Sequence, residues 1–305
     1  MDAWPDARYP APMPTPGSTR AYVALAAAGS LWGTGFLFGK IALAELAVPH
    51  MILYRLSLAA CGFLPILATS GNGIRRDDWP TLLAAAALGV PLLFLVQFEG
   101  LARTTVSHAA LMVGTAPILI GLAAARFASE RLTRRHWALL VASTGGAMLI
   151  VFGTPPPQGG QRPTVAGDLL VFLSLFAAVG WVLLSKRLMA TYAPSQVTAT
   201  VMVAGTVILD AWVLATSGTP PLRLSAKVWL ALTTQGLLCT TAATLLWNWG
   251  VSQVPASRAG LFVNLEPALG ALLGVLVLGE TLGWTGVAGG AIIIGAAVGA
   301  AAQPT

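Results

Sequence analysis

The sequence predicts an all-α integral membrane protein of ten transmembrane helices, arranged as two inverted five-helix repeats with both termini cytoplasmic. Three observations lead to this prediction. Hydrophobic residues make up 56% of the 305-residue chain and charged residues only 9%, whereas about a quarter of a soluble domain is charged. Apolar runs of about 20 residues recur along the chain. A stretch of the first half also reappears, in altered form, 150 residues later.

The charge pattern argues against a nucleic-acid partner. The formal net charge is +6, but the basic residues lie in short gaps between apolar runs rather than along one face. The two cysteines, Cys61 and Cys239, stand singly within apolar runs, without a CxxC pair or a histidine at metal-ligand spacing. We therefore expect no metal site and no cofactor, and a packing role for both thiols.

Residues 1–20 precede the first apolar run. They include five prolines and too little apolar surface to fold, so we expect a flexible cytoplasmic tail. The apolar run that follows is too long for the central region of a signal peptide, and many similar runs come after it. No cleaved signal peptide is therefore expected.

Ten apolar segments approach the roughly 20 residues that a helix needs to cross a hydrocarbon core of about 30 Å. The fifth of them is the shortest. In chain order the predicted spans are 21–42, 48–69, 79–101, 105–125, 136–152, 166–185, 195–216, 228–249, 257–278 and 282–301.

Lysine and arginine between the spans predict the orientation, because cytoplasmic loops are enriched in both. With the N-terminus inside, eleven basic residues are cytoplasmic: Arg8, Arg20, Arg75, Arg76, Arg126, Arg131, Arg134, Arg135, Lys186, Arg187 and Arg258. Four are outside: Arg103, Arg162, Arg223 and Lys227. The sequence therefore predicts a multi-pass protein of the cytoplasmic (inner) membrane with both ends inside.

An internal repeat divides the spans into two halves. Residues 100–132 align with residues 250–282 at a constant offset of 150, and ten of the 33 positions are identical. Apolar composition explains the shared leucines and alanines. It does not explain why Pro117 and Glu130 recur as Pro267 and Glu280, thirteen residues apart in both halves. We interpret the pattern as a duplication.

Each half contains five spans, so the second half must enter the membrane from the opposite side. The predicted organisation is a tail over 1–20, a first repeat over 21–153, a linker over 154–165 and a second repeat over 166–302. The linker is rich in proline and glycine and has no helical period. Inverted repeats of this kind can rock against each other around a site near the membrane midplane.

Several strings in the chain form a wider pattern. LWGTGFLFGK lies in the first span and LYRLSLAA in the second, and TAPILIGLAAARFASERL and LEPALGALLGVLVLGETL each precede a glycine-rich helix. These strings resemble the drug/metabolite transporter superfamily, EamA type, over nearly the whole chain after Arg20. The resemblance implies a secondary transporter or exporter of amino acids, sugars, nucleotides or related metabolites. Among these families the chain looks most similar to the YddG-type aromatic amino-acid exporters, although Glu99 stands where many relatives have an aromatic residue or alanine.

Glu266 is the most suggestive ionisable residue within the predicted spans. A carboxylate inside a membrane costs a few kcal/mol unless it faces water, a partner or a proton. Pro267 follows it, and a helical proline leaves the carbonyl four residues earlier without a donor. Pro117 is the corresponding helix-breaking residue of the first half. A helix break beside a carboxylate suits an ammonium group or a proton, and the alternative is a neutral acid hydrogen-bonded within the bundle.

Charged residues near the outer ends of the spans form a second group. Glu99 and Arg103 are four residues apart, which is typical of an interfacial ion pair. Lys40, Arg55 and His108 each fit the role of an anchor at the membrane interface. Together with Glu99 they can line an outward vestibule, in which Lys40 or Arg55 meets a substrate carboxylate.

Polar and aromatic residues predict a substrate site nearer the midplane. A face that carries tryptophan and small polar groups can stack a ring and bind an amino-acid head group, and the alternative is hydrogen bonding between helices. The predicted substrate-binding residues are Trp32, Phe36, Gln97, Trp181, Ser185, Thr244, Asn248, Asn264 and Glu266. Trp247, Trp249 and Trp284 lie nearer helix ends and are assigned to an interfacial aromatic belt.

The sequence favours export of a small amphipathic metabolite by alternating access, by preference an aromatic or hydrophobic amino acid. A facilitator or channel-like permease for another metabolite, such as a sugar, nucleotide or drug, is the main alternative. HExxH and GxSxG strings are absent, which disfavours a membrane-embedded enzyme, and GFLFGKI is one residue short of a phosphate loop. The expected partners are the lipid bilayer and a small-molecule substrate, with protons if transport is coupled to them.

Overall fold

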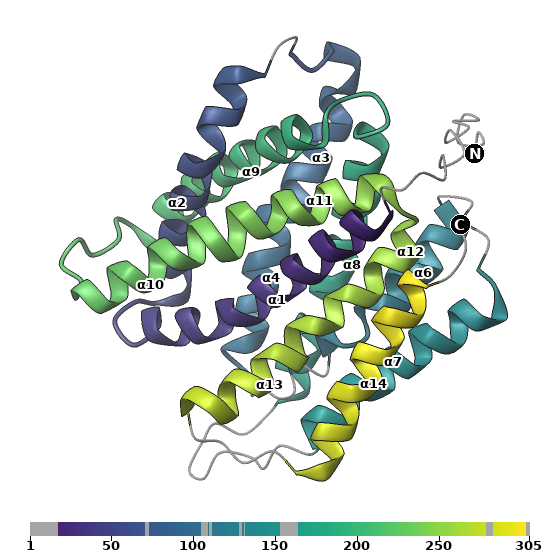
Figure 1. Ribbon diagram of the computed structural model, residues 1–305. Coiled ribbons are helices and arrows are strands. Elements are labelled where there is room, and N and C mark those ends of the chain that lie inside the picture. The colour runs from purple at the N-terminus through teal and green to yellow at the C-terminus, as the bar shows by residue number, and fades with distance from the viewer. Residues whose placement is uncertain are drawn as a thin grey trace.

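The computed structural model describes residues 18–70, 73–104, 109, 112–127, 130, 132–152, 164–278 and 283–302 of the chain. Within these residues the fold is all-helical, without β-strands, as the sequence predicts. The helices pack side by side into one bundle (Figure 1). The predicted tail over 1–20 and linker over 154–165 lie almost entirely outside the described residues.

The first half of the chain forms helices where the apolar runs predict them, and the second predicted span coincides with a helix at both ends. The helical segments are α1 (Ser18–Ala42), α2 (Val48–Thr69), the 3-10 turn η1 (Arg76–Asp78), α3 (Trp79–Ala87), the π-helical η2 (Leu88–Leu92), α4 (Leu93–Leu101), α6 (Ala116–Phe127) and α7 (Arg134–Phe152).

The second half repeats this order. Its segments are α8 (Val165–Leu188), α9 (Pro194–Ser217), α10 (Ala226–Gly236), the π-helical η3 (Leu237–Ala242), α11 (Ala243–Gln253), α12 (Ala256–Gly260), the 3-10 turn η4 (Leu261–Asn264), α13 (Leu265–Leu278) and α14 (Trp284–Ala301).

Local sequence signals set several helix starts. Prolines occupy the first turn of α2, α3 and α9, where a missing N–H costs nothing because that group has no partner within the helix. Thr164 accepts a hydrogen bond from the Gly167 N–H at the start of α8, and Ser225 caps α10 through the Val228 N–H. These caps satisfy backbone donors that the first helical turn leaves free.

Two π-helical segments interrupt spans that the sequence predicts as regular helices. In η2, Pro91 cannot donate a backbone hydrogen bond. In η3, the hydroxyls of Thr240 and Thr241 donate to carbonyls five residues earlier, at 2.9 Å to Gln235 O and 3.2 Å to Gly236 O. Single π turns of this kind are frequent at functional sites.

The two halves correspond element by element at an offset close to 150 residues. Leu88–Leu92 corresponds to Leu237–Ala242, and Arg134–Phe152 corresponds to Trp284–Ala301. The packing is reciprocal, since α1 lies against α10 and α11 while α8 lies against α3 and α4. Two further pairs join corresponding helices, α2 with α9 and α7 with α14. The first helix of each half thus packs on the third-span helices of the other half.

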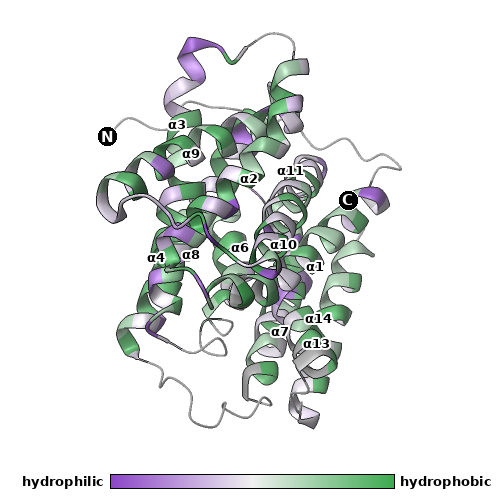
Figure 2. Cartoon of the chain, turned by 90° about the vertical axis from the view of Figure 1, so that its left-hand side faces the viewer, coloured by the Kyte–Doolittle hydropathy of each residue, from purple (hydrophilic) through white to green (hydrophobic). Residues whose placement is uncertain are grey.

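Seven helices in the described part of the chain are long and apolar enough to cross a membrane. They are α1, α2, the α3–α4 rod, α8, α9, the α10–α11 rod and α14. Apolar residues dominate most of the bundle (Figure 2). Large ones face outward, among them Leu64, Phe176 and Leu276, which are 52%, 54% and 71% exposed. The prediction of ten spans stays a prediction, because segments 105–125, 136–152 and 257–278 are not among these seven.

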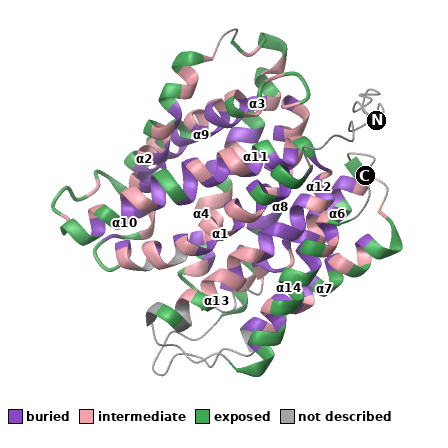
Figure 3. Ribbon diagram, viewed as in Figure 1, coloured by how far each residue is buried: buried purple, intermediate pink, exposed green. Residues whose placement is uncertain are grey.

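Contacts between connections define two ends of the bundle. At the first, called the Glu130 end, the Tyr192 hydroxyl after α8 donates to Asp78 before α3 at 2.6 Å, and the start of α1 meets α12 through Tyr22 and Arg258. At the second, called the Glu45 end, Glu45 after α1 accepts the Ser225 N–H at 2.9 Å. Buried residues run along α1, α8 and α11 between these ends (Figure 3).

Candidate functional site

Two tryptophans meet in the interior where α1 packs on α11. The ring centroids of Trp32 and Trp247 are 5.1 Å apart, and the two rings meet at an interplanar angle of 48°. Trp247 is 1% exposed. The assignment of Trp247 to an interfacial belt is therefore wrong, because tertiary packing turns this helix face inward. Trp249 and Trp284 are 39% and 88% exposed, which is compatible with the surface positions expected for them.

Trp181 of α8 reaches across to the π-helical segment of the first half. It is buried, and a Cβ placed on Gly89 would lie 2.4 Å from the Trp181 ring carbon Cδ1. Only a glycine leaves space for this approach. Trp32, Trp181 and Trp247 belong to one continuous interior cluster, so the structure brings together aromatic residues from both halves.

Several buried polar atoms of the predicted site have no hydrogen-bond partner among the described residues. Asn248 donates through Nδ2 to the Thr198 hydroxyl at 2.8 Å, and Thr244 is buried one turn before Asn248 on the same helix. Among the described residues, five buried atoms of the predicted site and its neighbour Trp247 have no partner: Trp181 Nε1, Ser185 Oγ, Trp247 Nε1, Asn248 Oδ1 and Asn264 Oδ1. Such groups are costly unless a ligand or water satisfies them.

Glu266 lies in the first turn of α13, directly after the 3-10 turn η4, rather than in the middle of a helix. It is half-buried. A carboxylate in this position is favoured by the helix dipole. The backbone of Gly33 in α1 approaches closely, since a Cβ there would lie 2.6 Å from the Glu266 carbonyl oxygen. Close packing of α1 on α13 thus fixes the backbone that carries Glu266.

The two repeated prolines lie at helix starts. Pro117 is the second residue of α6 and Pro267 the third of α13, and both are buried. Asn264, which precedes α13, donates through Nδ2 to Gly114 O at 3.2 Å and to Ser143 Oγ at 3.0 Å. Gly114 is the residue that corresponds to Asn264 in the first half, so this contact joins the two repeats.

The predicted vestibule residues differ in burial. Arg55 is 8% exposed, and its Nε donates to Thr240 Oγ1 at 2.9 Å. Glu99 is exposed and pairs with Arg103 at 3.0 Å, the i to i+4 ion pair that the sequence predicts. Gln97 is half-buried. The side chains of Phe36 and Lys40, and the whole of His108, lie outside the described residues.

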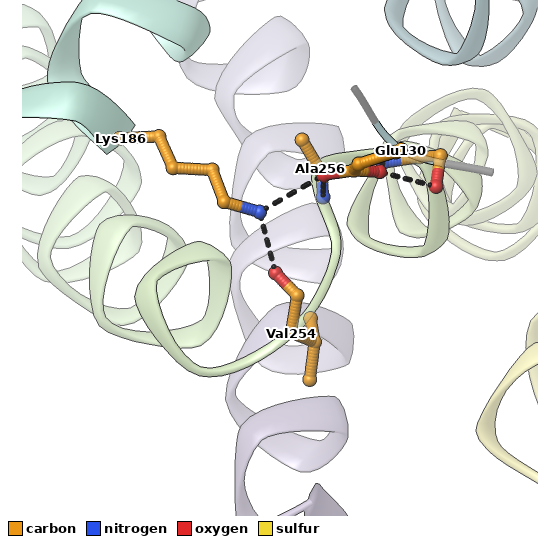
Figure 4. A network of polar contacts seen from close by, with 5 residues as sticks. Glu130, Lys186, Val254 and Ala256 are labelled. Atoms are coloured by element: carbon orange, nitrogen blue, oxygen red, sulfur yellow. Dashed lines mark hydrogen bonds and ion pairs between the residues drawn. The ribbon is translucent and has the colours of Figure 1, made fainter. Parts of the chain in front are cut away.

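A buried ion pair links the two halves at the Glu130 end (Figure 4). The Lys186 ammonium lies 3.1 Å from Glu130 Oε1 and also donates to Val254 O at 2.9 Å. Glu130 further accepts the N–H of Ala256 at 2.8 Å, the N–H of Ser257 at 3.1 Å and the Ser257 hydroxyl at 2.7 Å. We call these five residues the latch. It joins the α6–α7 connection to α8 and to the start of α12.

The setting of Glu130 favours its ionised form. Burial alone would raise the pKa of its carboxyl group, but the nearby Lys186 ammonium and the hydrogen bonds from Ser257 and Ala256 outweigh burial and hold the pKa below its usual value. Only 15% of the Glu130 side chain and 17% of the Lys186 side chain are exposed. The latch is therefore an electrostatic contact largely removed from water.

Sequence reasoning singled out Glu130 as half of a repeated motif but not as part of an ion pair. Lys186 is 56 residues away along the chain, and no local pattern specifies that pairing. The repeat does point to two residues of the latch, because Glu130 and Ser257 both lie in the aligned segments. Glu280, which corresponds to Glu130, lies outside the described residues.

Comparison with known proteins identifies the family. The EamA-like transporter family matches residues 19–152 and, separately, residues 165–301. The chain belongs to the EamA-like transporter family. One copy of the family unit thus covers each half of the chain, in agreement with the duplication read from the sequence.

Several relatives carry transporter names. An uncharacterized transporter of Archaeoglobus fulgidus is 24% identical over 91% of this chain and 96% of its own. The Bacillus subtilis uncharacterized transporter YwfM is 30% identical over 70% of this chain and 72% of its own. The Escherichia coli biotin transporter is 28% identical over 87% of each chain. A crystal structure with 20% identity has the same fold, with a TM-score of 0.77 over 92% of this chain and 97% of that chain.

These findings establish the class of the protein. It is a multi-pass membrane transporter whose partners are the lipid bilayer and a small-molecule substrate, and family members are transporters rather than enzymes.

Proposed function

We propose that the protein is an alternating-access secondary transporter of the cytoplasmic membrane that exports a small amphipathic metabolite, by preference an aromatic or hydrophobic amino acid. The proposal includes ten spans in two inverted repeats, with both termini in the cytoplasm. The observation that carries it is the interior group of Trp32, Trp181, Trp247 and Asn248, drawn from both halves, beside unpartnered polar atoms.

The chemistry of this group supports an amphipathic substrate. Trp32 and Trp181 offer ring faces for an apolar or aromatic body, and the unpartnered Trp181 Nε1, Ser185 Oγ and Asn248 Oδ1 offer donors and an acceptor. Glu266 offers a carboxylate to an ammonium group or a proton. Helix packing alone does not use these polar atoms, since they have no partner among the described residues.

The latch supports the alternating-access part of the proposal. Alternating access requires a contact between the halves that closes one side while the other is open. Glu130 and Lys186 belong to different halves and meet at the Glu130 end. That end also carries Arg75, Arg134 and other basic residues, so the positive-inside tendency favours a cytoplasmic location for it.

Biotin is a second candidate substrate. The Escherichia coli relative is named a biotin transporter and aligns with 87% of this chain. Biotin is amphipathic, with an apolar chain and a polar ring system, so the same interior group suits it. It belongs in the same transport assay.

Flux measured in proteoliposomes tests the substrate. Proteoliposomes that contain the purified protein are loaded with labelled tryptophan, leucine or biotin, and efflux is measured with and without a pH gradient. An efflux rate that depends on the gradient indicates proton coupling. The Trp32→Ala variant should lose most of the flux, whereas Trp212→Ala, which removes a tryptophan that is 47% exposed, should retain it. Protein that moves no amino acid but moves an unrelated solute would remove the amino-acid claim.

Cysteine labelling tests the inverted topology. In a protein without its native cysteines, Arg134→Cys and Gly283→Cys place single thiols at the starts of α7 and α14, within one residue of corresponding positions in the two repeats. An impermeant maleimide should react with them from opposite faces of the membrane. Reaction from the same face would refute the inverted arrangement.

A further inference from the structure

Arg55 is a buried cation near the middle of the bundle. It lies in α2, one side of which packs on α10, η3 and α9, and 8% of the residue is exposed. A buried guanidinium is costly unless it is paired with an anion or fully hydrogen-bonded. The contacts of Arg55 therefore decide whether its role is structural.

Two contacts hold the guanidinium group in place. Its Nε donates to Thr240 Oγ1 at 2.9 Å, and its central carbon lies 5.0 Å from the centre of the Phe94 ring. Thr240 sits in the π-helical η3, and its own hydroxyl donates to Gln235 O. The π turn thus presents a hydroxyl that orients Arg55, and the ring supplies a cation–π contact.

The terminal nitrogens of Arg55 remain available. Among the described residues, no oxygen accepts a hydrogen bond from Nη1 or Nη2, and no carboxylate forms an ion pair with them. Neither nitrogen is among the interior atoms that are both sealed from solvent and without a partner. The two terminal nitrogens, which form the donor fork that suits a carboxylate, are therefore not sealed from solvent.

The nearest acids do not fill this role. Glu266 interacts electrostatically with Arg55 but makes no ion pair with it within the described part of the chain. Asp210 accepts the Ser57 hydroxyl at 2.8 Å on another face of α2. Arg55 is held by a hydroxyl and a ring, while its two terminal nitrogens have no partner among the described residues. They can therefore bind an anion from outside the chain.

We propose that Arg55 binds the carboxylate of the transported substrate, so that the substrate class is an organic carboxylate. This inference rests on the proposed transport function and deepens it. Amino acids and biotin share this chemistry, since both carry a carboxylate. They differ in the ammonium group, which amino acids present and biotin lacks. Glu266 is placed to distinguish them because its carboxylate attracts an ammonium group.

Binding to matched ligand pairs tests the inference without relying on transport. The probes are tryptophan against tryptamine, which lacks the carboxylate, and biotin against its amide. At least one carboxylate of the panel should raise the melting temperature of the full-length protein in detergent, because a ligand that binds only the folded state stabilises it. Its uncharged or decarboxylated partner should bind at least about tenfold more weakly, since a hydrogen-bonded charge contributes about that much.

Variants of Arg55 assign the effect to this residue. Arg55→Gln should weaken carboxylate binding about 10-fold to 100-fold and leave binding of the partner ligand unchanged, and Arg55→Lys should restore part of it. Arg223→Gln removes the same charge from an exposed connection and serves as the control. Thr240→Val removes the hydroxyl that orients Arg55 and should weaken carboxylate binding less than Arg55→Gln does. Size-exclusion profiles check that each variant is folded.

The outcomes separate this inference from the proposed function. Equal binding of a carboxylate and its partner, no stabilisation by any carboxylate, or undiminished binding in folded Arg55→Gln would each overturn the role of Arg55. Flux of amino acids that persists in Arg55→Gln overturns it too and leaves the transport proposal standing. If biotin alone stabilises the protein and this effect is lost in Arg55→Gln, the role of Arg55 in carboxylate binding is supported and the proposed preference for amino acids is removed.

Discussion

Replacing Lys186 by methionine tests whether the latch holds the Glu130 end closed. Methionine keeps the length of the side chain and its apolar stem but removes the charge. Glu130 then keeps its hydrogen bonds from the Ala256 N–H and from the Ser257 N–H and hydroxyl. The variant should therefore fold, because the remaining donors still satisfy the buried carboxylate.

The structure sets the size of the expected effect. Removing one partner of a fully buried ion pair costs about 3–5 kcal/mol. About one sixth of each side chain is exposed here and three donors remain on Glu130, so we expect about 2 kcal/mol. If that energy favours the closed state alone, its loss raises the small open population about 30-fold.

A buried thiol beside the latch reports this population. Ser185 directly precedes Lys186 and is fully buried, so Ser185→Cys in a protein without its native cysteines labels only when this end opens. The rate of reaction with an impermeant maleimide, added on the side of the Glu130 end, should rise about 30-fold in Lys186→Met. Lys227→Met removes an exposed lysine and should leave the rate unchanged.

The double variant provides the decisive comparison. Glu130→Gln alone should also raise the labelling rate, and combining it with Lys186→Met should add little, because each change already breaks the same pair. An unchanged rate in folded Lys186→Met, or fully additive effects of the two changes, would refute the latch as a closing contact.

Three further predictions concern the interior and pH. Glu266→Gln should lower flux several-fold without loss of folded protein, and unchanged flux would end the role of this carboxylate. Gly89→Ala should lower the melting temperature and the flux, because its Cβ would collide with Trp181 at a cost of about 1–3 kcal/mol, whereas Gly145→Ala, with open space around it, should do neither. Because the pKa of Glu130 is lowered, the stabilisation that its carboxylate gives the latch is fully present above the usual carboxyl pKa range, and it is lost only as the pH falls below that range. Any pH dependence of flux at about pH 6–8 should therefore survive in Glu130→Gln.

Local pattern was sufficient to place most of the described helices. The predicted span 48–69 coincides with α2 (Val48–Thr69), and the offset of 150 residues recurs in the order of the elements. The reason is physical, since an apolar segment in a bilayer must satisfy its backbone hydrogen bonds within itself. The π turns were not predicted, because they depend on how Pro91 and the hydroxyls of Thr240 and Thr241 are satisfied by neighbouring groups.

The sequence by itself determined the class of the fold, the duplication of the chain and the repeated glutamates, Glu130 and Glu280. Which residues meet was decided only by the tertiary structure, because contacts between helices depend on how each helix is rotated and paired. Trp247 faces Trp32 rather than the membrane interface, Glu130 pairs with a lysine of the other half, and Arg55 donates to Thr240 of the other half. Hydropathy measures the preference of a segment for lipid, and it carries no information about such partners.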